Sequence, residues 1–511
     1  MLRCSVARAE VTAPAAIGRG GFFCCLPDAV RDTGALRPPL LPPCSLSLPH
    51  WNGCMDWRTE TDLLGEHRLS TDCLWGVHTA RAQMNFQVTD LRTSHDLVCA
   101  MAMVKKAACQ ANHELGYLPD ETAGPITQAC DDVIDGKLSD AFILDALQGG
   151  AGTSTNMNVN EVVANRALAI RGLPPGSYDA IHPLEHVNLH QSTNDVFPTA
   201  VKIAAISLVR ELSTRIAGLQ DSCQRREKAF AEIVKMGRTE LQPAVPITLG
   251  VEFGAFAEAF SRDRWRAFKC EERLRLVNLG GTAVGTGLTA PRSYIFLVIE
   301  KLRDVTGLGL SRGENTVDQT ANADAFVEVS GTVNAFATNL LKICGDLRLL
   351  HAAGEIRLPA VQAGSSIMPG KVNPVILECA MQTAIKAKAN NGIVSECASR
   401  GSLQINEFLP LLAHALLESL SMLGKVGTML AEHVDGIEAD PARCMARLVA
   451  CPTLATALLP ELGYDRVSEL LKAFAVTDQP DLREFLVEEL GAETVDRHLN
   501  PQALTSLGYR D

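Results

Sequence analysis

The sequence predicts an all-α protein organised around a bundle of long helices. Hydrophobic residues make up 47% of the 511 residues and aromatic residues only 5%, so the core has to be aliphatic. This composition suits packed helices better than a β-sandwich, which uses more aromatic and β-branched residues. Apolar residues also recur at spacings of three and four over long stretches, which is the period of one helix face.

The longest apolar stripe follows Pro198 and contains Ile206, Val209, Leu212, Ile216, Leu219 and Cys223. It predicts a helix over 199–235, about 55 Å long at ~1.5 Å per residue. Similar patterns predict long helices over 252–278, 316–351, 375–400 and 406–433, and shorter ones over 96–118 and 125–147. Five long helices with short connections favour a bundle, and their length indicates that neighbouring subunits bury part of them.

The domain boundaries follow changes in composition. Residues 1–54 hold five of the sixteen cysteines and seven of the twenty-five prolines without a helical or strand period, so we expect a disordered extension. Its longest apolar run, 22–26, is too short for the core of a signal peptide. We expect an N-terminal domain at 55–194, the bundle at 195–441, and a small C-terminal domain at 442–511, where the helices shorten.

Charge and cysteine usage exclude several function classes. The net charge of −12 and a pI near 5.5 argue against nucleic-acid or anionic-membrane partners. The cysteines form no CxxC pair or Cys/His cluster, so we expect buried thiols in a reduced cytoplasm and no metal site. No run approaches eighteen apolar residues, so no membrane span is expected. The glycine-rich stretch 280–287 follows no strand and predicts a helix-connecting loop rather than a dinucleotide site.

The stretch Gly364–Pro374, GSSIMPGKVNP, carries the strongest chemical signal. Its glycines and prolines exclude a regular element and favour a loop that closes over a small anion. Lys371 supplies a positive charge and Asn373 an amide, while Ser365 and Ser366 supply hydroxyls. A nucleotide-binding P-loop is excluded, because five residues separate the glycines and Val372 stands where Ser or Thr would hold magnesium.

This stretch resembles the signature of the aspartase/fumarase superfamily, whose members form fumaryl products by eliminating ammonia, water or an amine. Two further segments support the resemblance, which covers 58 to near the C-terminus: GGAGTSTNMNVNEVVANRA at 149–167 and QSTND at 191–195. Gly76-Val77-His78-Thr79, Ser154-Thr155, Thr193 and Ser402–Asn406 resemble the aspartase branch rather than the fumarases. The resemblance implies five-helix bundles from four subunits in one core, with active sites shared between subunits.

The resemblance also implies the site residues. Ser365 would be the general base that removes a proton beside one carboxylate of the substrate, without an organic cofactor. The resulting aci-carboxylate needs a cluster of donors, and the resemblance assigns these to Thr153, Ser192, Thr193 and Ser366, with Asn156 in support. Lys371 and Asn373 would hold the other carboxylate, and Asn194 and Thr239 the amino group. From the sequence alone, Thr153–Asn156 also suits plain helix capping, and His190 is interpreted as structural.

Two departures from the family pattern stand out. Glu240 occupies a position where relatives carry His or Gln, and a carboxylate there would favour an amine substrate over malate. The supporting glutamate maps to Glu378, so the two carboxylates would repel if they met without a bridge. The connection 350–355 before the loop is also several residues shorter than its usual counterpart.

We therefore expect a lyase that eliminates ammonia from L-aspartate. A fumarase, or a lyase for another aspartate derivative, is the alternative within the family. A non-catalytic helical scaffold of the same fold is the alternative of a different class. Scaffolds have partners and no turnover, so an assay separates the classes.

Overall fold

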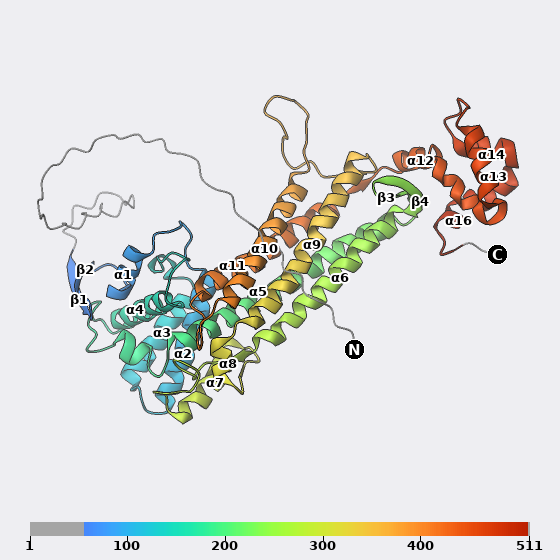
Figure 1. The fold of residues 1–511 in the computed structure, drawn as a ribbon. Coiled ribbons are helices and arrows are strands. Elements are labelled where there is room, and N and C mark those ends of the chain that lie inside the picture. Colours follow the sequence, from blue (N-terminus) through green and yellow to red (C-terminus); the bar gives the residue numbers. More distant parts are fainter. Residues whose placement is uncertain (1–55, 509–511) are drawn as a thin grey trace, which may run out of the picture. The chain divides into compact units, whose positions relative to one another are not determined.

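The computed structural model describes residues 56–508, and their fold is helical, as predicted (Figure 1). Its strands are short and pair only two at a time. The antiparallel pairs are β1 (Trp57–Asp62) with β2 (Gly65–Ser70), β3 (Val234–Thr239) with β4 (Gln242–Thr248), and β7 (Ile356–Arg357) with β8 (Glu438–Ala439). The pair β5 (Leu276–Val277) and β6 (Ser311–Arg312) is parallel. The predicted extension 1–54 lies outside the described residues.

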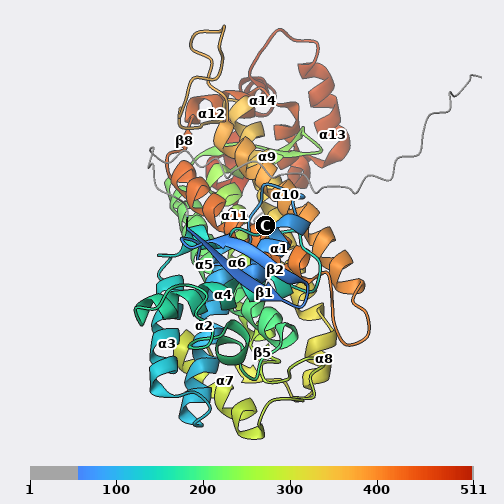
Figure 2. The same ribbon diagram turned by 90° about the vertical axis from the view of Figure 1, so that its left-hand side faces the viewer.

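The five long helices predicted from the apolar stripes are present and pack side by side (Figures 1 and 2). They are α5 (Thr193–Ala229), α6 (Leu249–Leu274), α9 (Asp324–Ala352), α10 (Val375–Ser399) and α11 (Leu409–Asp435). Their facing side chains form one continuous aliphatic core, as the composition required. The prediction of one helix over 316–351 was wrong at its start. A separate short helix α8 (Thr316–Ala321) comes first, because Asn322 is extended and interrupts the helix.

The N-terminal region packs α1 (Val77–Asn85), α2 (His95–Glu114), α3 (Asp120–Ile134) and α4 (Thr153–Ile170) beside the start of α5; α7 (Arg292–Thr306) contacts α2. The helix predicted over 125–147 was wrong at both ends. It starts at Asp120 and stops before Gly136, whose φ of +74° belongs to the left-handed region that ends helices. A turn of 3₁₀ helix at Ser139–Ala141 follows.

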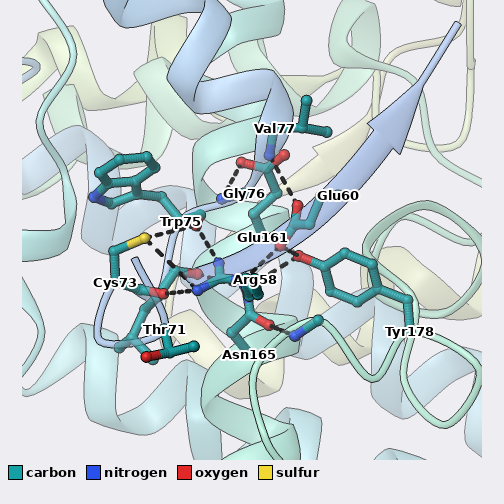
Figure 3. A network of polar contacts seen from close by, with 12 residues as sticks. Arg58, Glu60, Thr71, Cys73, Trp75, Gly76, Val77, Glu161, Asn165 and Tyr178 are labelled. Atoms are coloured by element: carbon teal, nitrogen blue, oxygen red, sulfur yellow. Dashed lines mark hydrogen bonds and ion pairs between the residues drawn. The ribbon is translucent and has the colours of Figure 1, made fainter. Parts of the chain in front are cut away.

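A buried carboxylate fixes α4 to the start of α1 (Figure 3). Glu161 accepts hydrogen bonds from the backbone N–H of Gly76 at 2.8 Å and the hydroxyl of Thr79 at 2.6 Å. It thereby caps α1, whose N-cap Gly76 has no side chain to do so. Burial raises the pKa of Glu161, against the effect of these hydrogen bonds. Arg58 holds the preceding chain by donating to Glu60 and to backbone carbonyls.

The C-terminal helices form a second hydrophobic core. They are α12 (Pro441–Val449), α13 (Leu459–Phe474), α14 (Leu482–Leu490), α15 (Ala492–Leu499) and α16 (Pro501–Thr505), with a 3₁₀ segment at Pro452–Leu458. Val234 and Met236 of strand β3 pack into this core. The hairpin β3–β4 therefore connects the bundle to the C-terminal helices.

Among the described helices, α11 alone is long and apolar enough to cross a membrane. The bent pair Pro441–Val449 and Pro452–Phe474 reaches that length and hydropathy only if the two segments are counted as one span. The sequence did not indicate this, because polar residues interrupt the apolar run of α11. In the structure 67% of the apolar window of α11 is buried inside the protein, as expected for a central bundle helix.

Candidate active site

The first cluster of predicted site residues lies where α4 begins. Gly152 is the N-cap, with φ of +90°, and a Cβ there would lie 2.2 Å from the ring of Phe197. Only glycine fits this turn. Gly152 has no side chain to cap α4, and Gln148 Oε1 instead accepts the N–H of Thr155 in the first turn at 3.0 Å, so Thr153 is not a capping residue. Thr153 is exposed at a helix N-terminus, where backbone N–H groups and the helix dipole favour an anion.

The start of α5 lies beside that turn. Ser192 is the N-cap: its Oγ accepts the N–H of Asn194 at 3.2 Å, while Asp195 accepts the N–H of Ser192 at 2.9 Å. In this capping box the Ser192 hydroxyl oxygen is an acceptor, so its hydrogen can still be donated. Thr193 is similar, since its Oγ1 accepts the side-chain amide of Asn156 at 3.1 Å. The hydroxyl groups of Ser192 and Thr193 can thus both donate a hydrogen bond to a ligand.

The glycine-rich stretch 280–287 contains no helix or strand, as predicted for a connecting loop, and it contacts this cluster. The expectation that no strand precedes it was wrong, because the two-residue strand β5 (Leu276–Val277) pairs with β6, which lies farther along the chain. Buried Asp195 accepts the N–H groups of Gly280 and Thr282, both at 3.0 Å. Burial raises the pKa of Asp195 to about 6, against the effect of these backbone hydrogen bonds. Asn194 donates its amide to the carbonyl of Ala283 at 2.8 Å, which leaves its Oδ1 available as an acceptor.

A buried lysine behind this cluster was missed by the sequence analysis. Lys105 on α2 is fully buried and donates to Asn188 Oδ1 at 2.7 Å and Gln191 Oε1 at 2.9 Å. Burial lowers its pKa to about 7, partly offset by the charge of Asp195. The only sign of it in the sequence was a lysine inside an apolar helical stretch. A lysine on the exposed face of a helix gives the same pattern. Among residues 56–508 no group of three His, Cys, Asp or Glu side chains is placed to hold a metal ion.

The hairpin β3–β4 carries Thr239 and Glu240 at its exposed tip. Glu240 and Leu241 have φ of +52° and +65°, the left-handed conformation of a two-residue hairpin turn. Among residues 56–508 the Glu240 carboxylate has no hydrogen-bond or ion-pair partner, and no cation bridges it to Glu378. Glu378 lies in the first turn of α10 and faces Arg348 at 3.7 Å. Within one chain Glu378 is thus paired with a cation of α9 rather than with the hairpin tip.

The loop GSSIMPGKVNP projects between α9 and α10 (Figure 1). Its base is closed by the N–H of Gly364, which donates to the carbonyl of Lys371 at 2.7 Å, and by Asn373, whose amide donates to the carbonyl of Gly364 at 2.8 Å. Ser365 Oγ accepts the backbone N–H groups of Ile367 at 3.2 Å and Met368 at 2.9 Å. Two N–H donors on one hydroxyl oxygen favour its deprotonated form. Lys371 and Ser366 are exposed.

Comparison with known proteins agrees with these features. A family model described as lyase matches residues 65–388. Aspartate ammonia-lyase from Bacillus subtilis is 39% identical over 89% of this chain and 98% of its own length, and that from Corynebacterium glutamicum is 41% identical over 89% and 88%. The chain belongs to the aspartase/fumarase superfamily.

Two solved structures of the superfamily have the same fold. A fumarate lyase:delta crystallin from Brucella melitensis, bound to cobalt, superposes with a TM-score of 0.85 at 44% identity, covering 88% of this chain and 100% of its own. A class II fumarase from Schistosoma mansoni gives 0.82 at 30% identity, covering 87% and 98%.

The superfamily fold separates the predicted site residues into two groups within one chain. Thr153, Asn156 and Ser192–Asn194 lie together at the start of α5. Thr239 and Glu240 follow the far end of this helix, whose 37 residues span about 55 Å at ~1.5 Å each. Figures 1 and 2 both show hairpin β3–β4 and the α9–α10 loop, which carries Ser365, Ser366, Lys371 and Asn373, at the end of the bundle away from α4. One chain alone does not bring all these side chains together.

Proposed function

We propose that this protein is an aspartate ammonia-lyase, which converts L-aspartate to fumarate and ammonia. The observation that carries the proposal is the pair of backbone N–H groups on Ser365 Oγ, in a loop that also presents Lys371. A serine hydroxyl is a poor acid, and such donors stabilise the alkoxide that a general base requires. The similarity to aspartate ammonia-lyases over nearly the whole chain supports this substrate.

In this mechanism Ser365 removes a proton from the carbon beside one carboxylate of aspartate. The extra negative charge on that carboxylate is received by the donors Thr153, Ser192, Thr193 and Ser366. Lys371 and Asn373 bind the other carboxylate, and the lysine provides the positive charge that an acidic protein needs to attract an anion. As the electrons return, the bond from carbon to nitrogen breaks and ammonia leaves.

The amino group is bound by acceptors. The side-chain N–H of Asn194 donates to the carbonyl of Ala283, which leaves Asn194 Oδ1 as an acceptor for the amino group. Thr239 offers a hydroxyl oxygen at the hairpin tip. Glu240 adds a negative charge beside Thr239 that attracts an ammonium group. Malate, the fumarase substrate, offers no such charge.

We infer a homotetramer whose active sites combine residues from several subunits. The length of α5 separates the two groups of site residues by about 55 Å, so an intact site requires more than one chain. Large apolar side chains also remain exposed on the bundle helices of the single chain: Trp265, Phe268, Leu349 and Ile385 are 58%, 57%, 50% and 58% exposed. Burial in a subunit interface accounts for them.

We further propose three domains, at 55–194, 195–441 and 442–511, and a location in the cytoplasm. The second hydrophobic core, which includes Leu448 and Val495, supports the C-terminal domain. The eleven cysteines among the described residues are all free, which suits a reducing compartment.

The first test offers L-aspartate and L-malate to the purified protein in parallel and follows the absorbance of fumarate. A rise with aspartate alone supports the proposal. A rise with malate alone makes the protein a fumarase. If the absorbance rises with neither compound, the protein acts on another succinyl amine or is a non-catalytic scaffold. Binding of fumarate would favour the enzyme, and no binding would favour the scaffold.

Site sharing has its own test. Ser365→Ala and Thr193→Val homotetramers should each be inactive or severely impaired. Mixed tetramers, reassembled from both after mild denaturation, should regain activity, because some sites then combine an intact loop with an intact α5 start. No regain would show that each chain supplies its own complete site.

A further inference from the structure

A buried ion-pair cluster joins the hairpin β3–β4 to the segment that leads into the Ser365 loop. Glu355 lies ten residues before Ser365, and its side chain is fully buried. Arg238 donates to both of its oxygens, at 3.0 and 2.5 Å, and Lys235 Nζ lies 3.1 Å from Oε2. Lys235 is itself buried and also pairs with Glu252 on α6 at 2.8 Å. A bidentate pair fixes orientation as well as distance.

The hairpin is built so that both cations reach one carboxylate. In a regular strand, residues three apart point to opposite faces. Lys235 and Arg238 nevertheless reach the same carboxylate, beside an irregularity in the strand pairing. From Met236 to Arg238 strand β3 advances two residues while β4 advances three, from Pro246 to Pro243, so the extra residue lies on β4 opposite Gly237. A Cβ on Gly237 would lie 2.8 Å from the carbonyl oxygen of Val245, so the close approach of β4 at this irregularity requires glycine.

Glu355 stays ionised in this environment. Burial opposes its ionisation, but the hydrogen bond from Arg238 and the charge of Lys235 outweigh burial and hold its pKa below the usual range. Its backbone is also fixed, since its carbonyl accepts the N–H of Asp440 at 2.9 Å, beside the pairing of β7 with β8. Neither Glu355 nor Lys235 reaches solvent, so neither is available to contact substrate.

We propose that Glu355 is a positioning residue that couples the hairpin tip, with Thr239 and Glu240, to the root of the Ser365 loop. Arg238 immediately precedes Thr239 in the chain. A movement of the Glu355 carboxylate therefore moves Arg238 and, with it, the backbone of the hairpin tip. The same ion pairs fix the position of Glu355, and so the point at which the chain leaves the end of α9 and leads into the Ser365 loop. Two segments that reach neighbouring subunits therefore hold a fixed spacing. This inference rests on the proposed function, which places both segments in active sites.

The test is Glu355→Gln, which keeps the shape of the side chain and removes its charge. We expect kcat for aspartate to fall about tenfold or more, because small misplacements of reacting groups are costly. Amide hydrogen exchange should accelerate about tenfold in both 239–242 and 358–374 while α5 and α6 remain protected. The matched control is Glu438→Gln. It breaks the exposed pair with Arg357, 3.7 Å apart on the neighbouring strands, and should change neither readout.

A kcat within about twofold of wild type, or faster exchange in only one segment, would overturn the inference. If Glu355→Gln does not fold, Arg238→Lys decides, since it keeps the charge and loses the bidentate contact while Lys235 still pairs with Glu355. The exchange measurement needs no substrate. Failure of the ammonia-lyase assay with wild-type protein therefore counts against the proposed function only. The coupling between the hairpin tip and the loop is then still tested by hydrogen exchange.

Discussion

Asn156 on α4 donates its side-chain amide to the Oγ1 of Thr193, the first residue of α5, at 3.1 Å. The same amide lies 3.3 Å from Asn188 Oδ1, which accepts the buried ammonium of Lys105 at 2.7 Å. Because the Thr193 oxygen is used as an acceptor, its hydrogen is directed away from Asn156. A buried amide thereby determines that this hydroxyl acts as a donor in the proposed carboxylate site.

Asn156→Ala should lower kcat/KM for aspartate on the order of tenfold, the value of one hydrogen bond of about 1.4 kcal/mol. Thr193→Val should lower it further, and the double variant should be no worse than Thr193→Val alone, since Asn156 acts through Thr193. Asn158→Ala is the control, because that buried amide donates to the carbonyl of Ala141 instead. Additive effects of the two site variants would contradict the arrangement.

Ser365→Ala should reduce turnover by about 10²- to 10⁴-fold, the range expected for loss of a general base. Secondary structure and oligomer size should not change, and fumarate should still bind, because Lys371 and Asn373 remain. Ser366→Ala removes a neighbouring hydroxyl assigned only as a donor and should weaken turnover less. A Ser365→Ala enzyme with a near-normal rate would remove Ser365 as the base.

The helices and the loop could be predicted from the sequence, because each signal is local. An apolar stripe needs only its own period, and Gly364 to Pro374 contains its own breakers. The errors were also local: Asn322 interrupts a stripe that continues through it, and Gly136 ends a helix whose apolar residues run on.

The supporting residues could not be predicted, because their partners are distant in the chain. Lys105 pairs with side chains 83 and 86 residues away, and Glu355 with Arg238, 117 residues away. In sequence these charges look like solvated surface residues, and only the packing of α2 and β3 buries them. The separation of the site into two groups follows from the length of α5, which the apolar stripe did predict.

Glu240→Gln should be tolerated, with kcat/KM for aspartate within about threefold of wild type. The side chain is exposed at a hairpin tip, so its attraction for the ammonium group of the substrate is screened by water and contributes little to the rate. Glu240→His, the residue type that the family resemblance implies at this position, should also keep kcat/KM within about threefold. A loss of a hundredfold or more with Gln would show that the carboxylate takes part in the reaction.

Lys105→Met should change how stability depends on pH. Burial lowers the pKa of Lys105 to about 7 in the folded protein, whereas the unfolded chain has the ordinary value near 10.5. Between these values the unfolded state binds more protons, so the free energy of unfolding of wild type should rise with pH. Below about pH 7 both states carry the charge and this contribution is constant.

The measurement is urea unfolding of wild type and Lys105→Met at matched protein concentration, at about pH 7 and about pH 9.5. The stability of wild type relative to the variant should increase with pH, because methionine has no proton to release. Lys106→Met is the control: this neighbouring lysine is partly exposed and pairs with Asp131 at 2.6 Å, so its difference from wild type should not grow. A Lys105→Met difference that is independent of pH would mean that the buried amine keeps its proton throughout, and that the start of α5 lies in front of a permanent positive charge.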